Sequence, residues 1–531
     1  MKLPAEQNTA VNFATLASEL GNLLGSVNVM TDFVERRFYS QDVYGSGELP
    51  ALVIRPGSAE ELSSALKLIA PYGVPVVPRG GGMSYTAGYL PRSTDAVMLD
   101  LLRLNKVVEI NEQDMYVTVE CGATWKELCD ELEPHGVRTP FYGPLSGLRS
   151  TVGGALSQGS VFLGTARYGT AAESVIGLDV VLVDGTTLHL GSHANRHGQP
   201  FFRQVGPDTM AMFLSDTGAL GIKTRATFRL IRPQRATRHL SYSFDTAGQL
   251  FEAMAEAARE DVAAEIFAID PSLQKVRMKR ISLREDAKSL GTLVKETGGF
   301  KGLVEGAKVV IAGRSFLKDG AFSVHVSVDG RDDADVEAKS AIVRRVMVAQ
   351  GGTEVENTLP KMMRANPFAE VNNMLGPRGE RWVPVHGTVP FSKAERMWRS
   401  CEAVFAKHRA AMVQYEIDHG YLTSTVGQAG TLVEPVLFWP DARNSFHERV
   451  LDAGYLAKLP VHPSNPAAAE AVARIRDDLA QAFMESGAIS FQIGKFYRYQ
   501  ETLDPTASSL LTAIKEIVDP QRRMNPGSLG L

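Results

Sequence analysis

The chain has 531 residues, of which 44% are hydrophobic and 22% are charged, and its formal net charge is −4. This composition is typical of a globular protein that is long enough for two or more domains. The sequence contains no long run of Lys and Arg. Binding to nucleic acid or to an anionic membrane surface is therefore not expected, because both need concentrated positive charge.

The N-terminal stretch has no continuous apolar core followed by a cleavage site of small residues, and no apolar run reaches the length that spans a membrane. We therefore predict a cytoplasmic protein without a membrane span. Three cysteines, Cys121, Cys129 and Cys401, are too few and too scattered for a disulfide framework or a four-ligand zinc site. We interpret them as buried thiols.

A β-α-β unit is predicted from Leu52 onward. The segment LVIRP is typical of a strand, SAEELSSALKLIAPYG of a helix and VPVVP of a second strand. Ser58 is expected to cap the start of the helix and Gly73 its end. The second strand leads into the triple glycine at 80–82, and a glycine-rich loop after a strand is a common ligand site in α/β units.

More strands follow in the segments VMLDL, VVEI and YVTVEC, before a helix in which Trp125, Leu128 and Leu132 share one face. A second glycine cluster, STVGGALSQG, spans residues 150–159. The segment SVIGLDVVLVDGTTLHL predicts a hairpin with an Asp-Gly turn. A third glycine motif, TGALGI at 217–222, leads into another strand.

A second domain is predicted after Pro233, where a strand followed by a helix occurs twice. AFSVHVSVDG leads into DDADVEAKSAIVRRVMV, and RWVPVHGTVP leads into SKAERMWRSCEAVFAKH. In the latter helix Met397, Cys401, Val404 and Phe405 fall on one face, as expected of a helix that covers a sheet. Residues 283–318 show no clear period.

Three glycine clusters beside strands of one domain are difficult to explain as independent tight turns. Glycine lets another group approach the main chain closely, and consecutive N–H groups form a site for an anion. We therefore predict one anionic cofactor shared by the three clusters. Composition alone does not distinguish FAD from another dinucleotide such as NAD.

The same motifs resemble those of the flavin oxidoreductases of the vanillyl-alcohol oxidase and p-cresol methylhydroxylase superfamily, which includes glycolate oxidase and D-lactate dehydrogenase subunits. The resemblance is carried by VIRPGSAEEL, VPVVPRGGGMSY, STVGGALSQG, a following Tyr-Gly pair, TGALGI and the ending VDPQRRMNPGSLGL. It implies an α+β protein with a two-part FAD-binding domain of the vanillyl-alcohol oxidase type and an α+β substrate cap domain. The implied units are an N-terminal helical extension at 1–44, the FAD-binding domain at 45–235, the cap at 236–484 and a C-terminal return to the FAD domain at 485–531.

The resemblance also implies which residues contact FAD. In that superfamily the first glycine loop receives the pyrophosphate, the second cluster lies against the pyrophosphate and the ring system, and the third flanks the adenine and ribose. The implied contacts are Pro78, Arg79, Gly80, Gly81, Gly82, Met83, Ser84, Thr151, Gly153, Gly154, Ser157, Gly159, Gly218, Gly221, Ile222 and Asn525.

Some members of the superfamily attach the flavin covalently through a histidine of the first loop. This chain has Met83 at that position, and a thioether cannot form the linkage. Attachment there is therefore excluded. His386, His419 and His447 of the second domain could serve instead, or could be ordinary hydrogen-bonded histidines.

Two subgroups of the superfamily offer different substrates. The D-2-hydroxy-acid dehydrogenases often carry a Gly-Glu-His-Gly metal motif near the C-terminus, whereas residues 487–494 here are GAISFQIG. No metal site is therefore expected. The 4-alkylphenol oxidases hold a phenolate between two tyrosines and an arginine, which the resemblance matches to Tyr85, Tyr497 and Arg498 as catalytic residues. The aspartate that those oxidases place just after a Tyr-Gly pair is missing, because Thr170 follows Tyr168-Gly169.

These observations lead to a predicted FAD-dependent oxidase or dehydrogenase. It would take a hydride from a small para-substituted phenolic substrate, an aromatic alcohol or alkylphenol, to flavin N5. One alternative is a metal-independent dehydrogenase of D-2-hydroxy acids such as lactate or glycolate, since a guanidinium and two phenols also suit a carboxylate. The other is a non-catalytic binding protein with a flavin fold. Oxygen or an electron-carrier protein would be the electron acceptor. The sequence does not decide whether the chain forms a homo-oligomer.

Overall fold

The computed structural model describes residues 11–278, 321–368 and 370–531. Three sheets, of four, five and eight strands, organise this part of the chain together with helices of very different length. The predicted α+β class is confirmed, because antiparallel sheets predominate and parallel pairing is confined to one of them. The prediction for residues 283–318 lies outside the described residues.

The first sheet contains the predicted β-α-β unit. Its strands in spatial order are β1 (Val29–Met30), β2 (Leu52–Ile54), β4 (Val97–Asp100) and β3 (Val76–Arg79). β2 and β3 each pair in parallel with β4. Helix α3 (Ala59–Ile69) connects them; Ser58 accepts a hydrogen bond from the Glu61 amide at its start, and Leu62 and Leu66 are buried. β3 therefore delivers the triple glycine to the carboxyl edge of this sheet.

The described residues before 45 pack on the same sheet and add one strand to it. Helix α1 (Phe13–Leu24) packs against α3, and β1 pairs antiparallel with β2. Helix α2 (Phe33–Tyr39) follows and contacts β2. The segment predicted as a helical extension thus also contributes an edge strand.

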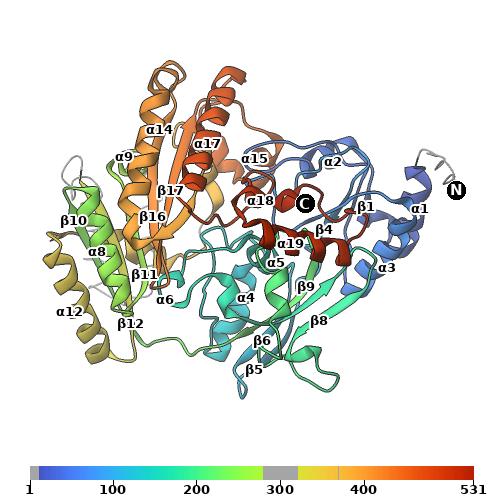
Figure 1. Ribbon diagram of the computed structural model, residues 1–531, viewed down its shortest axis with the longest axis horizontal. Coiled ribbons are helices and arrows are strands. Elements are labelled where there is room, and N and C mark those ends of the chain that lie inside the picture. Colours follow the sequence, from blue (N-terminus) through green and yellow to red (C-terminus); the bar gives the residue numbers. More distant parts are fainter. Residues whose placement is uncertain (1–10, 279–320, 369) are drawn as a thin grey trace.

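The second sheet is antiparallel throughout and lies next to the first (Figure 1). Its strands in spatial order are β5 (Val107–Asn111), β6 (Tyr116–Glu120), β9 (Ile222–Arg229), β7 (Val175–Val181) and β8 (Thr187–Gly191). The predicted helix is α4 (Trp125–Leu132), which begins with a capping box of Thr124 and Glu127 and buries the expected face. The short helices α5 (Val152–Gln158), α6 (Thr165–Tyr168) and α7 (Ala171–Ser174) follow it. The second glycine cluster therefore forms a helix, which its glycine content did not suggest.

The third sheet forms the core of the region predicted as the cap. Its strands in spatial order are β13 (Thr353–Glu354), β10 (Ala236–Phe244), β12 (Phe322–Gly330), β11 (Ala263–Ile269), β16 (Asp418–Val426), β17 (Gly430–Trp439) and β14 (Arg381–Pro384), and β15 (Gly387–Pro390) also pairs with β17. The long helices α8 (Ala247–Arg259), α12 (Asp333–Ala349), α14 (Ala394–Gln414) and α17 (Pro466–Glu485) lie along its outer side (Figure 1). On the predicted face of α14, Met397, Cys401 and Phe405 are buried and Val404 is half-buried.

The inner side of the third sheet faces the first two sheets. Helix α6 contacts β11 and β16 there, although its sequence belongs to the region of the second sheet. Shorter helices complete this part of the chain. They are α9 (Pro271–Met278), α13 (Thr358–Ala365), α15 (Ser445–Val450) and α16 (Ala453–Leu456).

The C-terminal segment runs back to the first two sheets. It carries helices α18 (Tyr499–Thr502) and α19 (Pro505–Val518). Met524 pairs in parallel with Val76, and the Asn525 amide donates to the Val76 carbonyl at 2.8 Å. Lys515 Nζ donates to the Ala219 carbonyl at 2.7 Å. The last residues are thus fixed beside the first and third glycine motifs.

Candidate active site

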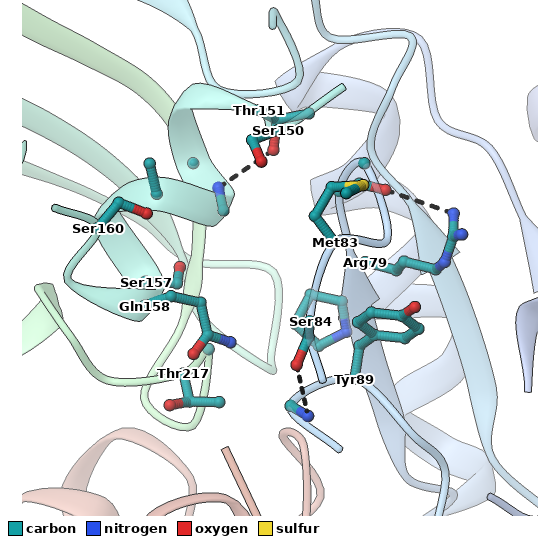
Figure 2. A pocket seen from close by; sticks show the side chains of 18 of the residues that line it. Arg79, Met83, Ser84, Tyr89, Ser150, Thr151, Ser157, Gln158, Ser160 and Thr217 are labelled. Carbon is teal, nitrogen blue, oxygen red and sulfur yellow. Dashed lines mark hydrogen bonds between the residues drawn. The ribbon is translucent and has the colours of Figure 1, made fainter. Parts of the chain in front are cut away.

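The first cavity lies where the three glycine clusters meet, and its volume is about 1020 Å³ including its open mouth. Figure 2 shows Arg79 and Ser84 of the first loop on one side and Ser157, Gln158 and Thr217 on the other. The clusters that the sequence linked to one ligand therefore surround one space.

Most of the predicted cofactor residues line this cavity. They are Pro78, Arg79, Gly80, Gly81, Gly82, Met83, Ser84, Thr151, Gly153, Gly154, Ser157, Gly218, Gly221 and Ile222. Gly159 and Asn525 are not among its lining residues. Gly159 ends α5 in the left-handed region with φ 66°, and the Asn525 side chain donates to the carbonyls of Gly88 and Thr217. Asn525 thus holds two loops of the cavity together from behind.

The glycines of the first loop are required by its packing against the second cluster. A Cβ at Gly81 would lie 1.8 Å from the Arg149 carbonyl oxygen, and one at Gly80 would lie 2.3 Å from Thr151 Oγ1. Both distances are far shorter than van der Waals contact. The missing side chains therefore serve the approach of two protein loops as well as the approach of a ligand.

The walls of the first cavity suit an anionic dinucleotide. The Arg79 guanidinium is held over the rings of Phe38, Tyr39 and Tyr89, at 5.1, 4.8 and 5.1 Å. Buried Gln158 Oε1 has no hydrogen-bond partner among the described residues. A buried cation, a spare polar atom and exposed glycine main chain fit the phosphates and the polar ring edge of FAD.

Further residues that the sequence analysis missed also line the first cavity, among them Tyr89, Gln158 and Lys223. Gln158 stands inside the second glycine motif, so its position was available as a signal. Lys223 directly follows TGALGI and pairs with buried Asp216 at 2.6 Å, but nothing in the sequence indicates which way such a side chain points.

A second cavity of about 1090 Å³ adjoins the first. The residues common to both are Met83, Tyr85, Pro144, Ser146, Val161 and Gln492. Its other walls come largely from the inner side of the third sheet. The second cavity is lined by alternate residues of β17, namely Leu432, Glu434, Val436 and Phe438. Trp382 of β14, Leu422 of β16 and Leu273 of α9 also line it. The third sheet therefore covers a largely apolar space beside the first cavity.

Tyr85 lies at the junction of the two cavities. Burial raises the pKa of its hydroxyl well above the usual value, and the nearby Glu434 carboxylate raises this pKa further. Its ring meets Trp382 edge to face with 5.8 Å between the centroids, and its hydroxyl hydrogen-bonds with the Gln492 side chain. Tyr85 is therefore a neutral phenol at physiological pH and can form hydrogen bonds with a neighbouring polar group.

The three predicted catalytic residues do not converge. Tyr85 lines both cavities, whereas Tyr497 is buried behind it and accepts a hydrogen bond from the His386 amide at 2.8 Å. Arg498 is exposed and donates to Gln481 Oε1 at 3.2 Å. The anchor that includes Arg498 is corrected, because this residue precedes α18 and its guanidinium pairs with the surface of α17.

Another arginine, Arg476, is buried near Tyr85. Arg476 of α17 is 3% exposed and donates to the Tyr85 carbonyl at 3.1 Å. Its guanidinium stacks over the rings of Tyr44 and Phe496 at 3.8 and 4.1 Å. It lines neither cavity among the described residues. Arg476 therefore supports the backbone of Tyr85 from behind.

The three histidines considered for flavin attachment line neither cavity. His386 is fully buried, stacks on Phe491 with 3.9 Å between the centroids, and burial lowers its pKa to about 3. His447 forms the capping box of α15 with Asn444, and His419 pairs with a carboxylate of α14. These contacts are structural.

Two family models cover most of the chain. Residues 50–191 match the FAD binding domain model, and residues 234–529 match the model of the C-terminal domain of FAD linked oxidases. The chain therefore belongs to the FAD linked oxidases. The first cavity lies largely within the matched FAD binding domain.

Among curated relatives, the chain is 32% identical to D-lactate dehydrogenase [cytochrome] 1 of Saccharomyces cerevisiae over 199 residues, which are 37% of this chain and 32% of that enzyme. It is 28% identical to glycolate oxidase subunit GlcD of Bacillus subtilis over 274 residues, 50% of this chain and 56% of that subunit. The matches thus span about a third to a half of the relatives' length.

Solved structures resemble the whole chain. With p-cresol methylhydroxylase the TM-score is 0.73 at 18% identity, covering 98% of each chain. With 4-ethylphenol oxidase from Gulosibacter chungangensis it is 0.72 at 18% identity, covering 99% of this chain and 98% of the other. The resemblance to the vanillyl-alcohol oxidase and p-cresol methylhydroxylase fold is thereby confirmed.

Within the described residues, no helix combines the length and the apolar character that crossing a membrane requires. The cytoplasmic location, the electron acceptor and the oligomeric state stay predictions.

Proposed function

We propose that this FAD-linked oxidoreductase oxidises a small, mostly apolar substrate that carries a phenol or aromatic alcohol group. The observation that supports this proposal is the chemistry of the second cavity. Aromatic and aliphatic side chains form most of its wall, and among them are Phe162, Trp382, Phe438 and Phe491. Such a wall favours a flat hydrocarbon body that stacks on aromatic rings.

The charges around the second cavity argue against an anionic substrate. Among the described residues that line it, no Arg, Lys or His is present, and Glu434 is the one carboxylate. A substrate carboxylate would lose its hydration without gaining a cation there, and it would face the charge of Glu434. Burying an unpaired charge is costly. A neutral phenol or alcohol avoids this cost.

Tyr85 and Glu434 would orient the polar end of the substrate. Glu434 offers an acceptor for a substrate hydroxyl, and Tyr85, with its raised pKa, offers a neutral phenol. When bound in the first cavity, FAD would supply the hydride acceptor. Tyr85 and Gln492 border both spaces, so they would position the substrate against the cofactor site and keep bulk water from it.

A second candidate, oxidation of D-2-hydroxy acids, is favoured by a different observation. The sequence relatives are named D-lactate dehydrogenases and a glycolate oxidase subunit. That function would need a cation for the substrate carboxylate, and the described wall of the second cavity provides none. We therefore rank it below the phenol or aromatic alcohol.

The decisive experiment is anaerobic bleaching of the flavin absorbance with two matched panels, para-substituted phenols with aromatic alcohols and D-2-hydroxy acids. We expect the first panel to bleach the flavin and the second to leave it oxidised. Bleaching by hydroxy acids alone would establish the second candidate. A protein that binds flavin but is bleached by neither panel would refute both, and one that binds no flavin would be a binding protein with a flavin fold. Admitting air afterwards distinguishes oxygen from a carrier protein as acceptor.

Glu434→Gln tests the polar end of the site in the same assay. The variant keeps the side-chain volume but removes the charge, and we expect bleaching by the best phenol or alcohol to slow by about tenfold to a thousandfold, the range for losing one positioned acid–base group or charge. Glu402→Gln, which changes a carboxylate of α14 that bonds to Tyr421, is the matched control and should bleach at the parent rate. Equal rates in Glu434→Gln and the parent would contradict the assignment.

A further inference from the structure

We infer that Asp179, His189 and His193 form a site for a divalent transition metal ion, on the second sheet and separate from both cavities described above. His189 Nδ1 lies 2.7 Å and His193 Nδ1 lies 3.2 Å from the same carboxylate oxygen of Asp179. The three ligand atoms all lie within 4.8 Å of one another. Two imidazole nitrogens and a carboxylate oxygen that converge on one point are a ligand set that Zn²⁺ prefers.

The fold explains why these side chains meet. Asp179 of β7 and His189 of β8 are direct cross-strand partners, so their side chains project from the same face of the hairpin. Gly191, with φ 78°, then turns the chain into the short 3-10 helix 192–194 and brings His193 back beside His189. The imidazole centroids are 4.5 Å apart. A sharp turn thus adds a third ligand to an existing pair.

Burial and exposure divide the cluster in a way that suits metal uptake. The Asp179 side chain is 8% exposed, whereas those of His189 and His193 are 47% and 38% exposed. The carboxylate is therefore fixed, and the imidazoles can open by a fraction of an ångström to admit an ion. Hydrogen bonds alone would require both rings to donate to one oxygen, whereas a metal ion would use both as neutral ligands.

An open coordination position is available beside the cluster. Asp179 and His193 border a hollow of about 550 Å³, whose wall also contains Glu109 and Arg225. Three protein ligands with one open side are typical of sites that keep a water or a small anion as fourth ligand. Glu109 adds negative charge that favours a cation, while Arg225, the cross-strand partner of Asp179 on β9, favours an anionic fourth ligand.

The test uses the complete FAD-containing protein, stripped of metal with a chelator and titrated with Zn²⁺. We expect one zinc ion per chain, and a rise in melting temperature as the hairpin is linked to its following turn. His189→Ala and His193→Ala should each weaken zinc binding by more than about tenfold, the least expected for loss of a ligand. Acidification should also weaken it, because protons compete for the imidazole nitrogens. FAD content should stay unchanged.

The matched control is His135→Ala, which removes an exposed histidine whose Nδ1 lies 2.7 Å from a single carboxylate, that of Glu112. This variant should bind zinc like the parent. Co²⁺ provides an independent readout, since its visible absorption reports a site of low coordination number. Zinc binding that is equal in the parent and in the His189→Ala/His193→Ala double variant would overturn the proposal, as would loss of binding in His135→Ala.

Discussion

The two cavities adjoin each other, but different parts of the residues form their walls. The first is built largely from main chain and small residues of three short glycine motifs, whereas the second is built from large side chains that arrive from several elements. A site formed by main-chain groups is specified by short contiguous sequence motifs. A side-chain site depends on strand register and helix rotation, which bring together residues far apart in the sequence. The cofactor of such a protein is therefore easier to predict from the sequence than its substrate.

The strongest way to break the main-chain site is Gly81→Ala. Its Cβ would lie 1.8 Å from the Arg149 carbonyl oxygen, so the two glycine loops would have to separate. We expect loss of FAD binding, with a strain of about 1–3 kcal/mol or more if the protein still folds. The ratio of flavin absorbance to protein absorbance after gel filtration measures the effect.

The matched control is Gly21→Ala in α1, where a new Cβ would meet its nearest neighbour, Ser26, at an ordinary 3.7 Å. It should keep full flavin content. If Gly81→Ala also retained flavin, the close packing of the first two glycine clusters would not be needed to shape the cofactor site.

Local patterns in the sequence were sufficient where local forces decide the structure. The Ser58 cap, the buried face of α4 and the strand before the triple glycine all follow from contiguous residues. Residues 152–158 are helical although they contain a Gly-Gly pair, because tertiary packing there overrides helix propensity. The inward arginine was missed although its sequence carries a signal. Arg476 falls on the apolar stripe of α17 beside Val472, Ile475 and Leu479, which are all buried, whereas Arg498 only precedes the short helix α18.

Arg476→Met should remove the contacts that hold the backbone of Tyr85 in place beside the second cavity. The substitution removes the hydrogen bond to the Tyr85 carbonyl and the stacking over Tyr44 and Phe496. We expect a loss of about 2–4 kcal/mol in the free energy of unfolding, the sum expected for one charged hydrogen bond and its cation–π contacts. Urea denaturation measures it. Arg476→Lys should recover only part, because lysine lacks the planar guanidinium; full recovery would show that charge alone is sufficient.

Lys495 makes the stability of the folded protein depend on pH. Its Nζ donates to the Leu90 carbonyl at 2.6 Å, and burial, with a smaller effect of Arg92, lowers its pKa from 10.5 to about 7. Between about pH 7 and 10.5 the unfolded chain therefore binds more protons at this residue than the folded chain does, so its contribution makes stability rise with pH across this window. Below pH 7 the penalty for the buried charge is fully present.

Lys495→Met should remove that penalty. We expect a gain of about 1–3 kcal/mol at pH 6, shrinking toward zero near pH 10, and a flatter stability profile between them. Melting temperatures across this range, compared with those of Lys458→Met as a second lysine variant, measure the difference. Parallel profiles for Lys495→Met and the parent would mean that Lys495 titrates as an ordinary surface lysine.

The smallest effect is expected for Arg498→Met. This variant tests whether Arg498, which the resemblance matches to the substrate anchor, takes part in catalysis although the buried arginine is Arg476. Arg498 is exposed and bonds to Gln481 on the surface of α17. Exposed pairs of this kind contribute little, so stability should change by less than about 0.5 kcal/mol. Flavin bleaching by the best substrate should stay within about threefold of the parent rate, since a tenfold change would need about 1.4 kcal/mol. A loss of several hundredfold with normal FAD content would show that the guanidinium turns inward during catalysis. The side-chain site would then include a cation that could pair with an anionic substrate.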